Sequence, residues 1–248
     1  MGISANIIFT ISKVEELIYG VTFGPATKRG KIIVNLSMVK KEDLDRVLDI
    51  FSQVMYSGIS VSPLIKIVEE GEAAGGMEIE RGKVGIITTC SMTIDGVLLK
   101  AGIPSKLKCG GVVQVRDREP LRFTDLLMYV GTTIDPLEVF TSRNMTSVLQ
   151  AITTGSGKIL ANFREVPMSA REDVEGILED LVAADFRGVL AVGEPNTPLL
   201  DVPVGRDRIG IAIIGGHNPM AAVMESGIEI KGKAISHLME VSEMRPLI

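Results

Sequence analysis

The segment VGIITTCSMTIDGVLLKAGI, residues 84–103, decides the fold, because a second version of it, IGIAIIGGHNPMAAVMESGI, occupies residues 209–228. Each version begins with a short apolar run, breaks into small polar residues and continues as an apolar-striped segment. A short apolar run followed by a helical stripe is typical of a strand that turns directly into a helix. The pair therefore predicts two copies of one strand–turn–helix unit.

A longer internal repeat surrounds the two units. GKIIVNLSMVKKEDLDRVLDIFSQVMYSGISV, from Gly30, matches GKILANFREVPMSAREDVEGILEDLVAADFRGVLAV, from Gly157. A weaker match upstream pairs residues 16–25 with residues 125–136. Strands and helices that alternate in duplicate predict an α/β or α+β protein, built as two pseudo-symmetric lobes with a ligand cleft between them.

The duplication also predicts the lobe boundary. We expect the first lobe at residues 1–120 and the second at residues 121–248, with an insertion at about 137–157 that the first lobe lacks. The middle of the insertion, residues 146–152, is predicted to be a short helix. The longest uncharged apolar runs are far shorter than the roughly 20 residues of a membrane helix.

Within each copy the pattern predicts the same order of elements. Residues rich in β-branched side chains, typical of strands buried on two faces, are followed by an amphipathic helix and a further strand. The predicted buried strands are residues 31–36 and 159–163, and the later strands are residues 58–61 and 188–192.

The breaks inside the two quoted segments predict a ligand site. A strand that leads into a helix N-terminus presents unpaired backbone N–H groups, which favour an anion. Asn218 is predicted as an N-cap followed by Pro219, and the repeat gives Thr93 the same role in the first copy. The residues expected to surround the ligand in these turns are Thr88, Thr89, Cys90, Ser91, Thr93, Gly215, Gly216, His217 and Asn218.

Composition limits the possible partners. The chain has 248 residues, 46% apolar residues, a net charge of −5 and two cysteines. Nucleic-acid binding depends on clustered Lys and Arg, and only two small basic clusters are present, so we expect no direct contact with DNA by this chain alone. The N-terminus lacks the pattern of a signal peptide. These features predict a cytoplasmic protein that is neither disulfide-bonded nor embedded in a membrane.

Two other chemistries compete for the turn residues. Cys90 at a helix N-terminus, with His217 from the other lobe as its base, could form the site of a thiol enzyme. Cys90, Cys109, His217 and His237 could bind zinc, but they lack the closely spaced ligand pairs of structural zinc sites. The sequence contains neither a Walker A motif nor G-x-G-x-x-G, which disfavours the familiar nucleotide sites.

Five segments, in the same order, resemble the regulatory domain of the archaeal nitrogen-responsive transcriptional repressors, the NrpR family. They are CSMTIDGVLLKAGIP from Cys90, GTTIDPLEVF from Gly131, MTSV from Met145, GSGKILANFREVP from Gly155 and GGHNP from Gly215. The resemblance implies a non-enzymatic sensor that needs no cofactor and releases DNA when 2-oxoglutarate accumulates. DNA-binding members carry an N-terminal winged helix-turn-helix, which we do not expect in this chain.

The resemblance thus implies a stand-alone sensor that forms a homodimer or associates with a helix-turn-helix-bearing relative. For 2-oxoglutarate we expect Arg164 to supply a charge-assisted bond, since its repeat partner is Ser37 and the ligand is unsymmetrical. The alternative for Arg164 is an ion pair with Glu165 or a neighbouring acid on the surface. Three functions therefore remain open: an effector sensor, a thiol enzyme using Cys90 and His217, and a ligand-free interaction module.

Overall fold

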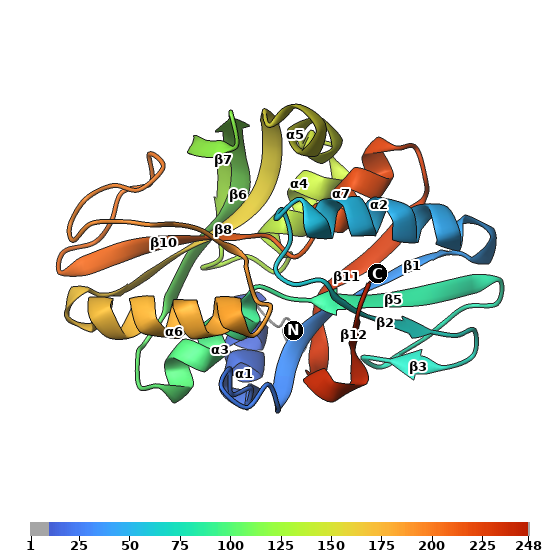
Figure 1. The fold of residues 1–248 in the computed structure, drawn as a ribbon, viewed down its shortest axis with the longest axis horizontal. Helices are drawn as coiled ribbons and strands as arrows, with labels where there is room; N and C mark the ends of the chain where they lie inside the picture. The colour runs from blue at the N-terminus through green and yellow to red at the C-terminus, as the bar shows by residue number, and fades with distance from the viewer. Residues whose placement is uncertain (1–9, 248) are drawn as a thin grey trace, which may run out of the picture.

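The computed structural model describes residues 10–247. Residues 1–9, on which the signal-peptide prediction partly rests, and Ile248 lie outside the described residues. The protein is a mixed α/β chain with two five-stranded sheets, as the repeat predicted, and all of its strand pairs are antiparallel. The sheets lie on either side of the centre of the molecule, with the helices packed above one and below the other (Figure 1).

Each sheet contains one of the two long buried strands that the repeat predicted, in an inner position. In order, the first sheet contains β11 (Ile230–Glu240), β1 (Lys31–Lys40), β5 (Lys83–Thr89), β2 (Leu64–Val68) and β12 (Arg245–Pro246). The second contains β7 (Glu119–Met128), β6 (Lys106–Arg116), β8 (Gly157–Pro167), β10 (Arg208–Ile214) and β9 (Val189–Val192). A small hairpin joins β3 (Ala73–Ala74) to β4 (Met77–Glu78).

The helices follow the same two-part plan. Helix α2 (Leu44–Tyr56) packs with α7 (Asn218–Glu225) over the first sheet, and α6 (Arg171–Ala183) packs with α3 (Met92–Lys100) over the second (Figure 1). The remaining helices are α1 (Thr10–Gly20), α4 (Pro136–Ser142) and α5 (Val148–Thr154). Each helix pair therefore takes one member from each repeat.

The strands are exchanged between the repeats in the same way. β6 belongs to the first repeat but pairs with β8 of the second, with Gly110 opposite Asn162. β11 belongs to the second repeat but pairs with β1 of the first, with Val34 opposite His237. The chain therefore crosses from one sheet to the other at the β5–α3 turn and back at the β10–α7 turn.

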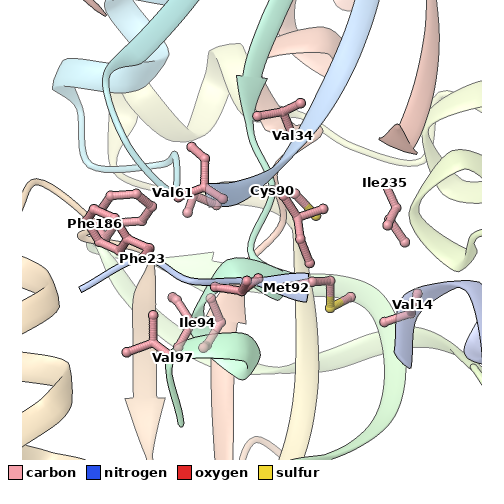
Figure 2. Packing of buried hydrophobic residues seen from close by; sticks show 14 of the residues in the cluster. Val14, Phe23, Val34, Val61, Cys90, Met92, Ile94, Val97, Phe186 and Ile235 are labelled. Carbon is pink, nitrogen blue, oxygen red and sulfur yellow. The ribbon is translucent and has the colours of Figure 1, made fainter. Parts of the chain in front are cut away.

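The exchange gives the two sheets a shared core. The largest apolar cluster contains Val34 of β1 and Ile211 of β10, and the rings of Phe23 and Phe186 lie 4.7 Å apart between centroids. Figure 2 shows Phe23 beside Phe186, with Cys90 and Met92 among the surrounding apolar side chains. Burying apolar surface from both repeats in one cluster holds the two sheets together.

Two local predictions were wrong, and a third was incomplete. The first repeat has no strand at residues 58–61, and the corresponding strand is β2, which begins at Leu64. The chain turns at Gly58, whose φ is 83°, and several residues then lead it to the edge of β5, where β2 pairs. The weak upstream match joins unlike structures, since residues 16–20 end helix α1 and residues 125–128 end strand β7. The insertion holds α5 close to the predicted position, together with α4, which the prediction lacked.

Candidate functional site

The two turns at which the chain crosses between sheets touch each other at the centre of the molecule. A Cβ atom on Gly216 would lie 2.6 Å from Nδ2 of Asn35 and 2.9 Å from the carbonyl oxygen of Thr89. Both distances are too short for a real side chain, so glycine is needed for the turns to approach this closely. The polar break in each quoted segment therefore serves first to let the two crossings pack together.

Equivalent side chains anchor the two turns to equivalent strand residues. Oγ1 of Thr93 accepts from the N–H of Ile33 at 3.0 Å and donates to its carbonyl oxygen at 3.2 Å. Oδ1 of Asn218 accepts from the N–H of Leu160 at 2.8 Å, and Nδ2 donates to its carbonyl oxygen at 3.0 Å. Each side chain bonds to the backbone N–H and C=O of one strand residue, as a neighbouring strand would. These bonds fix α3 against β1 and α7 against β8.

This arrangement corrects the predicted capping roles. The N-cap positions of α3 and α7 belong to Ser91 and His217, one or two residues earlier than expected. Thr93 and Asn218 lie in the first turn of their helices, where their side chains reach the strands instead of the helix N–H groups. The hydrogen bonds to buried strand backbone prevail because an unpaired buried N–H is costly.

A small polar cavity lies between the crossings and draws its lining from both repeats. Its volume is about 10 Å³, which accommodates one water-sized molecule and is far too small for a diacid. In place of the expected cleft, the turns thus enclose only a small inner cavity lined by buried residues. The polar residues that line it are Asn35, Ser91, Tyr129, Asp135, Asn162 and His217.

Two asparagines at the same position of the two repeats organise this inner cavity. Asn162 donates to Oγ of Ser91 at 2.9 Å and accepts from the hydroxyl of Tyr129 at 2.7 Å. Asn35 accepts from the N–H of Ile235 at 3.0 Å. Neither asparagine was predicted to belong to the site. The available signal was an asparagine in each of two otherwise apolar, buried strands, since a buried amide requires partners.

Arg164 is fully buried and pairs with a carboxylate from the other repeat. Its Nη1 contacts Oδ2 of Asp95, a residue of α3 that also accepts from Ser105 at 2.5 Å. Burial raises the pKa of Asp95, while the charge of Arg164 opposes this shift. The predicted surface pair with Glu165 or a neighbouring acid was therefore wrong, since Arg164 pairs in the interior with an acid from the other repeat, and Glu165 pairs with Lys108.

Unpartnered polar atoms are concentrated on the predicted site residues. Among residues 10–247, six buried side-chain nitrogen or oxygen atoms have no hydrogen-bond partner. Five of them belong to Thr89, Arg164 and His217, and the sixth is Oγ of Ser37, the repeat partner of Arg164. Leaving such atoms unpaired costs about 1–3 kcal/mol each. Their concentration at the junction of the repeats is the chief chemical peculiarity of the molecule.

All ten predicted site residues are buried, so the structure places them at the junction without exposing them to solvent. Gly215 and Gly216 form the β10–α7 turn, and Thr89 to Ser91 form the β5–α3 turn. Thr88 is buried on β5, where it pairs with Asn35. Arg164 is on β8, under α3, and does not belong to the lining of the inner cavity.

The thiol hypothesis finds no activated cysteine. Burial raises the pKa of Cys90 to about 12, and burial lowers the pKa of His217. Within the described chain neither ring nitrogen of His217 has a hydrogen-bond partner, so no Cys90–His217 pair is formed. Residues 10–247 contain no group of three His, Cys, Asp or Glu side chains arranged to hold a metal ion. None of their helices is long and apolar enough to cross a membrane.

Comparison with known proteins shows what class of molecule carries this site. The model of the NrpR regulatory domains NRD1 and 2 matches residues 7–246. A global nitrogen regulator, NrpRI, of Methanosarcina mazei is 39% identical over 96% of this chain and 73% of its own length. A global nitrogen regulator, NrpR, of Methanocaldococcus jannaschii is 31% identical over 95% of this chain, which spans 39% of that relative.

A solved structure agrees with these relatives. The crystal structure of a nitrogen repressor-like protein from Methanococcus jannaschii matches with a TM-score of 0.83 at 30% identity, covering 98% of this chain and all of the other. These matches identify the duplicated fold as that of the NrpR regulatory domains, and the matching relatives are named as nitrogen regulators. The chain belongs to the NrpR family of nitrogen regulators.

Proposed function

We propose that this chain is a cytoplasmic effector-binding domain that senses 2-oxoglutarate at the junction of its two repeats. The supporting observation is that five of the six unpartnered buried atoms of residues 10–247 belong to Thr89, Arg164 and His217. A protein retains such atoms at a cost, and a ligand that bonds to them recovers it.

The chemistry of the unpartnered atoms suits a keto diacid. The hydroxyl of Thr89 and one ring N–H of His217 can donate to one carboxylate. Nε and Nη2 of Arg164 can donate to the other, since Asp95 engages only Nη1 in the described residues. Charge-assisted bonds of this kind contribute about 1.5–3 kcal/mol each. Binding in the micromolar to millimolar range, about −8 to −4 kcal/mol, requires only a few of them.

Binding at the junction requires a change of conformation. The inner cavity of about 10 Å³ cannot admit the ligand while the crossings remain in contact. 2-Oxoglutarate would therefore favour an arrangement in which the β5–α3 and β10–α7 turns move apart. A ligand that prefers one arrangement shifts its population and alters any assembly that depends on it. We propose that the assembly is a homodimer or a complex with a helix-turn-helix-bearing relative, with no direct DNA contact by this chain.

Calorimetry with 2-oxoglutarate, with succinate and glutamate as controls, tests this function. We expect heat from 2-oxoglutarate in the micromolar to millimolar range and at least tenfold weaker binding by Thr89→Val, which removes an unpartnered hydroxyl and keeps the shape. Ser37→Ala is the matched control, because it removes the unpartnered hydroxyl that lies outside the predicted site. Its affinity should equal that of the unmodified chain.

Two results would count against the proposal. Absence of heat at millimolar 2-oxoglutarate would show that this chain does not bind 2-oxoglutarate. Equal weakening of binding by Thr89→Val and Ser37→Ala would show that the ligand does not bind at the predicted site. Co-purification with a DNA-binding relative that 2-oxoglutarate leaves unchanged would instead favour the ligand-free interaction module.

A further inference from the structure

A second, larger hollow lies beside the junction and opens to the surface between α4, α7 and β11. Its volume is about 440 Å³, which is within the usual range for small-molecule sites. His217 lines both this α4–α7 pocket and the inner cavity, so its imidazole stands between them. The two hollows are otherwise lined by different residues.

The imidazole of His217 is the buried polar group that points to a ligand here. His217 is only 2% exposed, and neither of its ring nitrogens has a partner in residues 10–247. Met92, its repeat partner, fills the same place in the first repeat with an apolar side chain and is equally buried. Packing alone would therefore be served by a methionine. A neutral imidazole has one donor and one acceptor nitrogen, so it can bond on its two sides at once.

The rest of the pocket lining contains one acidic side chain, one basic side chain and several apolar side chains. Glu138 and Arg143 lie at the two ends of α4. Oε1 of Glu138 accepts from the N–H of Ala234 at 2.7 Å, and its second oxygen remains available. Arg143 is exposed and makes no ion pair with any described residue. The apolar part of the lining is formed mainly by Ile134, Val139, Met220, Met224 and Ile230.

This combination selects a class of ligand. A dianion would meet the carboxylate of Glu138, and a purely apolar molecule would leave Arg143 and His217 unpaired. A zwitterion places its ammonium against Glu138 and its carboxylate against Arg143. Methionine side chains adapt to varied apolar shapes, so Met220 and Met224 suit an aliphatic or thioether group.

We propose that the α4–α7 pocket binds a free amino acid with an apolar side chain, held by Glu138, Arg143 and His217. This site shares His217 with the one proposed for 2-oxoglutarate, but its other residues are different and the inference does not rest on that proposal. The shared imidazole joins the two, because His217 occupies the N-cap position of α7, at the turn where the chain crosses between sheets. If both ligands bind, each therefore changes the affinity of the other by the same factor.

Titration of the full chain with L-methionine and L-leucine, followed by NMR or calorimetry, tests the inference. We expect saturable binding at millimolar concentrations, and at least tenfold weaker binding of hexanoate and hexylamine, which each carry one of the two charges. Arg143→Gln should weaken L-methionine binding about tenfold or more, as expected for loss of a charge-assisted pair. Arg206→Gln, which alters an exposed arginine outside the pocket lining, is the matched control and should bind normally.

His217→Met separates a ligand role from a structural one. It copies the first repeat, so the melting temperature should remain the same or rise while L-methionine binding is lost. A large fall in melting temperature would overturn the ligand role of His217. The inference also fails if no amino acid binds, if Arg143→Gln binds normally, or if hexanoate binds as well as L-methionine.

The two proposals can fail separately. Thr89→Val acts on the junction and Arg143→Gln on the pocket. Binding of 2-oxoglutarate without binding of amino acids would therefore leave the proposed function intact and remove only the second site.

Discussion

Asp135 shows at the scale of one residue how the junction couples burial to local structure. Its Oδ1 accepts from the N–H groups of Leu137 and Glu138 at 2.8 and 3.3 Å, which makes it the N-cap of α4. The same carboxyl lines the inner cavity beside Tyr129. Burial raises the pKa of Asp135 to about 6, although the two N–H bonds oppose this effect. The group therefore gains a proton on folding in mildly acidic solution.

The raised pKa predicts how stability depends on pH. The folded state binds the Asp135 proton more tightly than the unfolded state does. Protonation of Asp135 therefore contributes to the free energy of unfolding at about pH 4, and this contribution is lost as the pH rises through about 6. The loss is on the order of 3 kcal/mol. Asp135→Asn keeps a good N-cap and cannot titrate. The difference in free energy of unfolding between this variant and the unmodified chain, measured in urea, should shift by about 3 kcal/mol in favour of the variant between pH 4 and pH 7. A difference that does not change with pH would contradict the raised pKa of Asp135.

At the scale of elements, the contact between the two crossing turns decides how the sheets meet. β5 and β10 end at the same point, and the helices that follow them leave toward opposite sheets. The close approach relies on Gly216, because no side chain fits between this turn and Thr89. The turn of the first repeat carries Ser91 at the same position, so the pseudo-symmetry stops at this contact.

Substitution of glycine in two elements tests the close contact. Gly216→Ala should lower the free energy of unfolding by about 1–3 kcal/mol, the usual cost of overpacking a full interior. Gly176→Ala is the control, since no described atom lies within 4 Å of the added Cβ in helix α6. It should raise stability by about 0.5–1 kcal/mol. Equal effects of the two changes in urea unfolding would show that the turns are not in tight contact.

At the scale of the whole molecule, the exchange of α3–β6 for α7–β11 makes the two repeats one folding unit. Each sheet needs a long strand from the other repeat, and the largest apolar cluster includes residues of both. The lobes predicted from sequence, residues 1–120 and 121–248, thus each include a strand that completes the opposite sheet. Stability cannot be assigned to either repeat alone.

Fragment complementation tests this interdependence. We expect residues 1–120 and residues 121–248, prepared separately, to lack cooperative thermal transitions, because each would expose the apolar faces that the other covers. Mixing them should restore the circular dichroism spectrum of the full chain. The full chain should unfold in one transition with equal calorimetric and van't Hoff enthalpies. A cooperative transition in either isolated fragment would contradict the exchange.

Local sequence patterns predicted much of this architecture. The repeat predicted the duplicated strands, the helices after them and the two turns, because period and turn chemistry depend on neighbouring residues. The same patterns misassigned Thr93 and Asn218 as helix caps, since their hydrogen bonds go to strands distant in sequence. Asn35, Tyr129 and Asp135 were missed for the same reason, because only folding brings them to one cavity.

The sequence by itself determined the duplication, the two strand–turn–helix units and the family to which the chain belongs. Only the tertiary structure decided that β6 and β11 change places and that the polar breaks meet at a buried crossing. The physical reason is that β6 and β11 could each pair with either of two similar strands, β1 and β8. The choice between them depends on long-range packing of the whole core, which no local period encodes.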